Sequence, residues 1–209
     1  MNGLSVAVIA GGMSRRFGSD KTLAPFEGKP LIQWAVDGAN AYAARVFVVG
    51  KDCKKYSFLK KVTFLEDKYD IQCPMVGLVT VFDHTPDNDA VLILSADTPL
   101  FPFAALNAMY KAFKGHDVAV PDINGKLYSC AAIYHKKTAA LFENMLKNRD
   151  YKLINAFDKL DVVKLGEDFF APWDKDKTGF VNANTPAELE YIANRRKRNG
   201  ENRKTAQTD

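Results

Sequence analysis

An apolar segment that runs into a glycine-rich turn with nearby cations places the strongest limit on how this chain folds. The segment Leu4–Ala10 has the composition of a buried strand, and Gly11 and Gly12 follow it directly. Glycine lets the backbone approach a ligand closely, so successive N–H groups can converge on one anion. Arg15 and Lys21 follow and would neutralise phosphate charge. The pattern predicts a nucleotide triphosphate site at the start of an α/β domain.

Two familiar phosphate-binding patterns do not fit this turn. The P-loop requires four residues between its glycines and a lysine directly after the second. Here five residues separate Gly12 from Gly18, and two more precede Lys21. The dinucleotide pattern G-x-G-x-x-G fails as well, because Gly11 and Gly12 are adjacent. We therefore expect a longer loop that lies over the nucleotide, with Lys21 reaching back to the phosphates.

Apolar β-branched runs alternate with helical patterns along the whole chain, which predicts a mainly parallel sheet with helices on both faces. The expected fold is a single Rossmann-like three-layer α/β/α domain over residues 1–194, followed by a basic polar tail over residues 195–209. Strands are expected over Ser5–Ala10, Arg45–Val49, Val62–Leu65, Ala90–Leu94, Asp117–Val120, Ser129–His135 and Val162–Leu165. Helices are expected to begin at or near Pro30, Met75, Pro102, Lys136, Tyr151 and Pro186, and Asn124-Gly125 predicts a hairpin turn.

Charge and composition exclude several functional classes. Of 29 Lys and Arg and 25 Asp and Glu residues, six basic and two acidic ones lie in 195–209, so this segment accounts for the net charge of +4. No basic face or base-stacking aromatic pattern indicates a nucleic-acid partner. No apolar run approaches the length of a membrane span, and a cytoplasmic location is expected. The three cysteines have no C-x-x-C spacing, so neither a disulfide framework nor a zinc site is expected.

Several polar residues follow predicted strands, and ligands of open α/β sheets bind at the carboxyl ends of strands. Asp67 follows the third strand and Asp97 the fourth, close in space to the glycine turn after the first. A carboxylate fixed beside phosphates suits Mg²⁺, which binds through one or two carboxylates and substrate oxygens. The alternatives are an exposed loop acid at Asp67 and a turn-forming Asp97 before Thr98-Pro99.

The segment Asn182-Ala183-Asn184 alternates polar and apolar residues, so both amide side chains are expected on one face. They could bind one polar substrate together. The alternative is a purely structural helix start, with Thr185 as N-cap before Pro186.

The pattern A-G-G-x-S-x-R-x-G-x-D-K over residues 10–21, followed by G-K-P-L, resembles the signature of the molybdenum cofactor guanylyltransferases. These are nucleotidyltransferases with a glycosyltransferase-A-like fold. The resemblance continues at 65–67, 74–78, 96–99 and 182–186, and it spans residues from about 5 to 192.

The resemblance implies transfer of GMP from GTP to the molybdopterin form of the molybdenum cofactor, with release of pyrophosphate. It implies Arg15, Lys21 and Asp97 as catalytic residues and Mg²⁺ on Asp97. Nucleotide contacts are expected from Ile9, Ala10, Gly11, Gly12, Ser14, Lys21, Asp67 and Asp97. Asn182 and Asn184 would contact the pterin-bearing substrate, and molybdoenzyme maturation proteins are expected partners.

Two departures from the family pattern, and the choice of nucleotide at Gly11, leave alternative functions open. Cys73 replaces the glycine usual before Pro74, and Tyr128-Ser129-Cys130 replaces a polar-proline pair. These differences leave room for a non-catalytic protein that delivers the cofactor. Cytidylyl- and sugar-nucleotidyltransferases carry A-A-G where this chain has Ala10-Gly11-Gly12, so the guanine prediction depends on Gly11.

Overall fold

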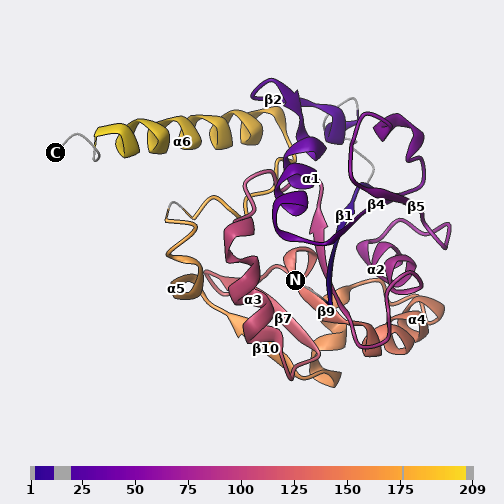
Figure 1. The fold of residues 1–209 in the computed structure, drawn as a ribbon. Helices are drawn as coiled ribbons and strands as arrows, with labels where there is room; N and C mark the ends of the chain where they lie inside the picture. The colour runs from indigo at the N-terminus through magenta and orange to yellow at the C-terminus, as the bar shows by residue number, and fades with distance from the viewer. Residues whose placement is uncertain (1–2, 12–19, 176, 206–209) are drawn as a thin grey trace.

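The computed structural model describes residues 3–11, 20–175 and 177–205, with side chains as far as Arg196 (Figure 1). One sheet forms the centre, in the strand order β10-β7-β9-β6-β1-β4-β5, with β8 (Lys126–Leu127) paired to β7. The strands of this path are β1 (Leu4–Ile9), β4 (Arg45–Gly50), β5 (Thr63–Glu66), β6 (Ala90–Ser95), β7 (Val118–Ile123), β9 (Ile133–His135) and β10 (Val162–Leu165).

The half of the sheet that holds the predicted site is wholly parallel. β1 pairs in parallel with β4 and with β6, and β4 pairs in parallel with β5. Only β9 runs against its neighbours β6 and β7 among the strands of the main path. The carboxyl ends of four successive parallel strands therefore meet at one edge, as the sequence predicts.

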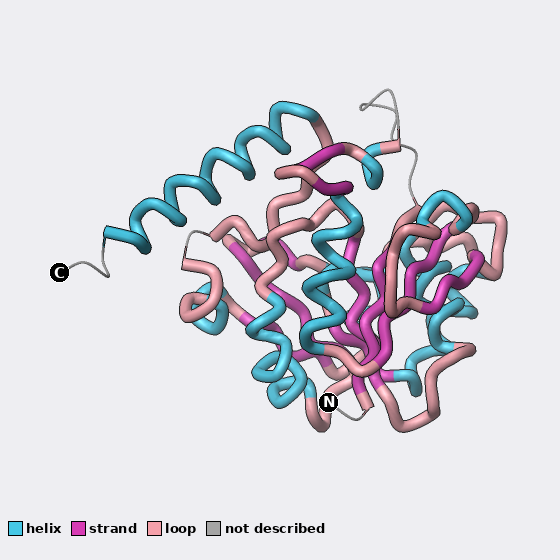
Figure 2. The backbone as a smooth tube through the Cα atoms, turned by 45° about the horizontal axis from the view of Figure 1, so that its top comes forward, coloured by secondary structure: helices cyan, strands magenta, loops and turns pink. Residues whose placement is uncertain are grey.

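Helices cover both faces of the sheet, which confirms the three-layer architecture (Figure 2). Alternate residues of a strand point to opposite faces. Accordingly Val6 and Val8 of β1 pack in the cluster that contains α1 (Leu31–Tyr42) and α3 (Leu106–Phe113). Ala7 and Ile9 pack in the cluster that contains α2 (Pro74–Phe82) and α4 (Ala139–Lys147).

Three local predictions need correction. The strand expected over Ser129–His135 is shorter, because only Ile133–His135 pairs with the sheet. Ser129–Ala131 forms a 3-10 turn, in which the Ala131 N–H donates to the carbonyl of Tyr128. The helix expected near Tyr151 is a 3-10 helix over Leu153–Lys159. α1 begins at Leu31 rather than Pro30, because Pro30 ends a two-stranded ribbon of β2 (Pro25–Phe26) and β3 (Lys29–Pro30).

Two turn and cap predictions are confirmed. Asn124 and Gly125 both have positive φ, 53° and 73°, and they join β7 to β8 as a two-residue hairpin. Thr185 caps α6 (Pro186–Thr205), since its Oγ1 accepts the Glu188 N–H at 3.1 Å. The Glu188 carboxylate in turn accepts the backbone N–H of Asn184 at 2.9 Å, so Thr185 and Glu188 satisfy backbone donors on both sides of the helix start.

The first part of α6 is anchored to the β2–β3 ribbon, and the rest of the helix projects from the body (Figures 1 and 2). Ile192 packs with Phe26 and Leu31, and the guanidinium of Arg196 lies 4.1 Å from the Trp34 ring centre. Arg196 also pairs with Glu27 at 2.6 Å. The helix runs past residue 194, and the domain boundary predicted there stays a prediction.

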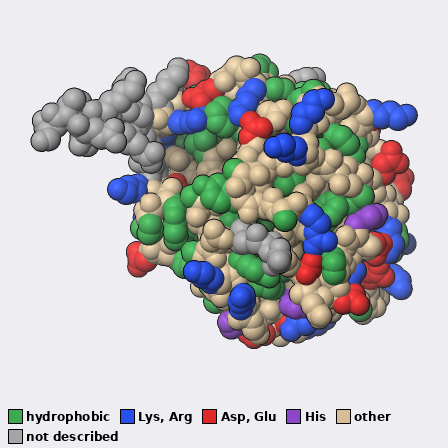
Figure 3. Space-filling view, in the orientation of Figure 1, with side chains coloured by type: hydrophobic (Ala, Val, Ile, Leu, Met, Phe, Trp, Pro, Cys, Tyr) green, Lys and Arg blue, Asp and Glu red, His purple; other side chains and the backbone are tan. Residues whose placement is uncertain are grey.

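Charges are mixed over the surface. Figure 3 shows Lys and Arg side chains interspersed with Asp and Glu over the face in view. In the part of the chain that the structure describes, no helix has both the length and the apolar content that a bilayer crossing demands.

Gly38 of α1 is required by packing rather than by backbone conformation. A Cβ at this position would lie 2.2 Å from Cδ2 of Phe103, whose buried ring also packs edge-on against Phe101. We expect Gly38→Ala to lower the free energy of unfolding by about 1–3 kcal/mol, although alanine favours helix. Urea denaturation measures the change.

Gly166→Ala is the matched control, because a Cβ at Gly166 meets nothing within 4 Å and φ is −74° there. Equal stability of Gly38→Ala and the unaltered protein would contradict this account of the packing.

Candidate active site

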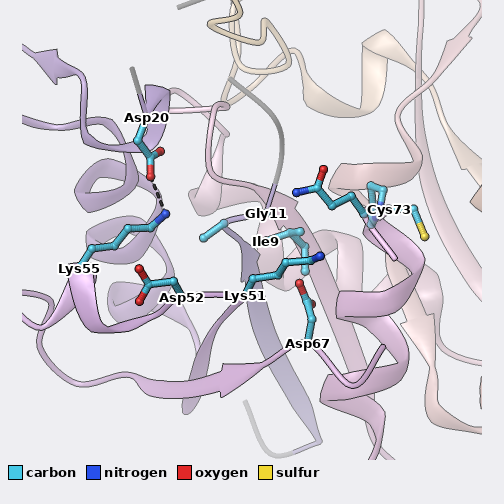
Figure 4. A pocket seen from close by; sticks show the side chains of 11 residues that line it. Ile9, Gly11, Asp20, Lys51, Asp52, Lys55, Asp67 and Cys73 are labelled. Atoms are coloured by element: carbon cyan, nitrogen blue, oxygen red, sulfur yellow. Dashed lines mark ion pairs between the residues drawn. The ribbon is translucent and has the colours of Figure 1, made fainter. Parts of the chain in front are cut away.

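A cavity of about 220 Å³ opens at the carboxyl ends of β1, β4 and β5 (Figure 4). Its wall combines backbone from the end of β1, charged side chains from the segments after β4 and β5, and the turn before α2. The lining residues are Ile9, Ala10, Gly11, Asp20, Lys51, Asp52, Lys55, Asp67, Gln72, Cys73 and Pro74. The position is the one that parallel α/β sheets use for ligands.

Gly11 and Asp67 face each other across this cavity. Among the described residues, a Cβ on Gly11 would come within 4 Å only of Oδ2 of Asp67, at 3.7 Å, which is an ordinary contact. Burial raises the pKa of the Asp67 carboxyl, and the charge of Lys51 offsets part of that rise. Packing against the described residues therefore does not by itself require glycine at position 11.

Lys21, Asp97 and Asn184 form a second group beside the end of β6. The Asp97 carboxylate is 3% exposed, and its Oδ2 pairs with the ammonium of Lys21. The same ammonium donates to Oδ1 of Asn184 at 3.1 Å. Three segments far apart in the sequence thus meet at one carboxylate.

The alternation predicted for the Asn182–Asn184 segment is present in the structure. Ala183 is fully buried in the cluster of Phe26 and Ile192, and its N–H donates to the Asp97 carbonyl at 2.8 Å. Asn182 accepts the Thr98 hydroxyl at 3.2 Å on the side opposite Ala183. Both amides are therefore held next to Asp97.

The residues around Asp97 fit a hard divalent cation. Oδ1 of Asp97 is a buried acceptor that no donor reaches within the described residues. In the same ranges, no three His, Cys, Asp or Glu side chains are grouped as metal ligands. A cation at Asp97 would have to take its other ligands from substrate oxygens and water, which is the usual habit of Mg²⁺.

The thiols near the site are held protonated. Burial raises the pKa of Cys130 to about 11, and the Asp97 carboxylate adds to the effect. Burial also raises the pKa of Cys73. Because the thiolate is the nucleophilic form of cysteine, neither residue is suited to covalent catalysis at neutral pH.

The structure divides the predicted residues between the two groups. Ile9, Ala10, Gly11 and Asp67 line the cavity, whereas Lys21, Asp97, Asn182 and Asn184 gather beside it. Gly12, Ser14 and Arg15 lie outside the described residues.

Sequence reasoning missed part of the cavity wall. Asp52 follows β4 and could have been found by the strand-end rule that identified Asp67. Lys55 lies in the 3-10 turn η2 (Lys54–Tyr56) and had no sequence signal.

Comparison with known proteins identifies the family. A family model described as "MobA-like NTP transferase domain" matches residues 6–162. The chain belongs to this family. A "Probable molybdenum cofactor guanylyltransferase" of Geobacillus sp. strain WCH70 is 30% identical over 197 residues, which cover 92% of this chain and 99% of that protein. One of the same name from Aquifex aeolicus strain VF5 is 33% identical over 146 residues, covering 70% of this chain and 71% of the relative.

A solved structure supports the fold independently. The crystal structure of molybdopterin-guanine dinucleotide biosynthesis protein A from Archaeoglobus fulgidus superposes with a TM-score of 0.80 at 24% identity. The match covers 91% of this chain and 97% of that one. The fold expected from the resemblance to the molybdenum cofactor guanylyltransferases is confirmed.

The buried carboxyl of Asp67 is expected to lower the stability of the folded protein at neutral pH. Because burial raises its folded-state pKa above the ordinary 3.8, folding favours the protonated carboxyl. Any stabilisation from that carboxyl is present below pH 3.8 and is lost as the pH rises through the folded-state value. We expect Asp67→Asn to raise the unfolding midpoint in urea at pH 7, with the gain shrinking toward pH 3.8.

Asp70→Asn provides the control from the same loop. The hydrogen bond from Lys51 lowers the pKa of this fully exposed carboxyl, so its removal should give no gain at pH 7. A loss of stability in Asp67→Asn at pH 7 would contradict the burial argument.

Proposed function

We propose that this protein transfers GMP from GTP to the molybdopterin form of the molybdenum cofactor and releases pyrophosphate. The observation that carries the proposal is the buried Asp97 paired with Lys21 beside a cavity at the carboxyl ends of parallel strands. The names of the curated relatives supply the substrates of the reaction.

The cavity and the Asp97 group divide the nucleotide between them in this proposal. The nucleoside lies in the cavity, where Ile9, Ala10 and Gly11 offer backbone groups and Asp67 a carboxylate. The triphosphate extends toward Lys21, with Gly12, Ser14 and Arg15 as further proposed contacts.

The chemistry proposed needs no covalent intermediate. A phosphate monoester is largely dianionic at neutral pH, so its oxygen can attack the α-phosphorus of GTP without a general base. A new P–O bond forms while the bond to pyrophosphate breaks, and pyrophosphate leaves with its electron pair. Catalysis then depends on in-line positioning and charge neutralisation.

Lys21 and Asp97 supply the charge control in this mechanism. NTP transferases of this family depend on a divalent metal, and we propose Mg²⁺ held by Asp97. When bound there, the cation neutralises phosphate charge. Lys21 steadies the triphosphate and the leaving pyrophosphate, within reach of its present partners Asp97 and Asn184.

The acceptor is proposed to approach from the side of Asn182 and Asn184. The oxygens of both amides accept hydrogen bonds from protein groups, Thr98 and Lys21, so their orientation is fixed. Their N–H groups suit the carbonyl and phosphate oxygens of a pterin-bearing acceptor. Delivery of the product to molybdoenzyme maturation proteins, in the cytoplasm, belongs to the same proposal.

Asp97→Ala tests the proposed reaction most directly. We expect loss of metal-dependent turnover by at least about a hundredfold, because the buried carboxylate would no longer hold a cation at the phosphates. Pyrophosphate release from labelled GTP, Mg²⁺ and molybdopterin-form cofactor measures the reaction. Asp52→Ala, which alters an exposed cavity acid, is the control.

Retained Mg²⁺-dependent activity in Asp97→Ala would remove the metal assignment. Binding of GTP by the unaltered protein with no pyrophosphate release in the complete mixture would favour the non-catalytic delivery protein.

Gly11→Ala tests the preference for guanine. Gly11 lines the cavity, and an added methyl group would clash with none of the residues that the structure describes, so we expect the fold to be unchanged. We expect GTP use to fall by about tenfold more than CTP use, as kcat/KM for each nucleotide. Equal losses with the two nucleotides would remove the argument that this position selects guanine.

A further inference from the structure

A chain of buried hydrogen bonds connects the turn after β4 to the segment that carries Lys21. The Tyr56 side chain, at the end of η2, is 1% exposed. Its hydroxyl lies 2.8 Å from Oγ1 of Thr22 and 3.4 Å from the carbonyl oxygen of Ala10. Thr22 belongs to η1 (Lys21–Leu23), so Tyr56 touches both the end of β1 and the neighbour of Lys21.

The direction of these hydrogen bonds is determined by protonation. Asp20 accepts the Thr22 hydroxyl at 2.7 Å and the Thr22 backbone N–H at 3.1 Å, and an ionised carboxylate only accepts. The Thr22 hydroxyl has then used its proton, so the single proton of Tyr56 is directed to Thr22 Oγ1 at 2.8 Å, with the Ala10 carbonyl oxygen as a second, longer acceptor at 3.4 Å. Burial raises the pKa of Tyr56, which keeps the phenol protonated as the donor.

The hydrogen-bond chain ends at the cavity wall, in an ion pair. Oδ2 of Asp20 pairs with Lys55 at 2.5 Å (Figure 4). Burial alone would raise the pKa of Asp20, but the hydrogen bonds from Lys55 and Thr22 outweigh it and lower the pKa. Both Asp20 and Lys55 line the cavity, so the hydrogen-bond chain joins the cavity wall to the segment that carries Lys21.

We propose that Tyr56 is a positioning residue that sets the location of Lys21 relative to the end of β1. The proposal rests on the proposed function, in which Ala10 and Lys21 contact two parts of one nucleotide. The hydrogen bond from Tyr56 to Thr22, with the 3.4 Å contact between the same hydroxyl and the Ala10 carbonyl oxygen, sets the distance between those two segments before the nucleotide arrives. Fixed geometry of this kind lowers the cost of ordering the site when the ligand binds.

Tyr56→Phe removes the hydroxyl and keeps the buried ring. We expect GTP affinity in the presence of Mg²⁺ to fall roughly fivefold, the equivalent of one net hydrogen bond. Titration calorimetry measures the affinity. A purely structural role would lower the thermal unfolding midpoint and leave the affinity of the folded protein unchanged.

A variant that lacks the side chain of Lys21 shows whether Tyr56 acts through that lysine. In Lys21→Ala, the further change Tyr56→Phe should alter GTP affinity by less than about twofold, because the group it positions is absent. The same fivefold loss in both backgrounds would overturn the proposal, and so would unaltered affinity in Tyr56→Phe alone.

Thr22→Val tests the next link of the hydrogen-bond chain, and Thr85→Val is its matched control. Both threonines are 6% exposed. Thr85 follows α2 and donates to the carbonyl of Val81 in that helix, and it does not line the cavity. Thr22→Val should weaken GTP binding as Tyr56→Phe does, and Thr85→Val should not. Equal effects of the two threonine variants would count against the proposal.

The unaltered protein separates the two levels of inference. If it binds no GTP, the proposed function and the positioning role both fail. If it binds GTP and releases pyrophosphate while Tyr56→Phe binds equally well, the positioning role alone fails.

Discussion

The side chain of Asp97 is only 4% exposed, and its carboxylate pairs with the ammonium of Lys21. An ionised group so deeply buried is tolerated only when it is paired and hydrogen-bonded. The pair also determines the chain's arrangement, because Lys21 lies before α1 and Asp97 follows β6. Asn184, which shares the lysine, ties the segment before α6 to the same point. Removing one partner would leave the other charge buried, so the site and the packing around it depend on the same contact.

The parallel half of the sheet explains why unrelated loops converge on this ion pair. β5, β4, β1 and β6 run in one direction, so the segments after them leave at one edge. Each strand is short, and β1, β4 and β6 are largely buried, with polar residues following where these strands end. The strands therefore fix the separation of Gly11, Asp67 and Asp97, while the loops supply the chemistry.

Sequence patterns predicted the elements whose cause is local. The apolar run of β1, the Asn124-Gly125 hairpin and the Thr185 cap each follow from residue types within a few positions, and all three are present. The 3-10 turn at Ser129–Ala131 and the β2–β3 ribbon were not predicted, although each is closed by hydrogen bonds within its own short segment. In the site, long-range contacts limit what the sequence can predict. Asp67 and Asp97 follow strands and could be found, whereas Lys55 and Tyr56 gain their positions from hydrogen bonds to Asp20 and Thr22.

Completion of the site requires both ends of the folded domain. The amides of Asn182 and Asn184 reach Asp97 only when the segment before α6 is in place, and α6 is held by Trp34 and Glu27 through Arg196. Glu27 has a positive φ of 44°, which is unfavourable for a residue with a side chain, so the ribbon turn needs such support. The ribbon in turn follows directly after the η1 segment that carries Lys21. Packing of α6 on the ribbon and placement of Lys21 beside Asp97 are therefore linked through a short stretch of chain, and the segment that carries Lys21 has contacts with Tyr56 on one side and, through the ribbon, with α6 on the other.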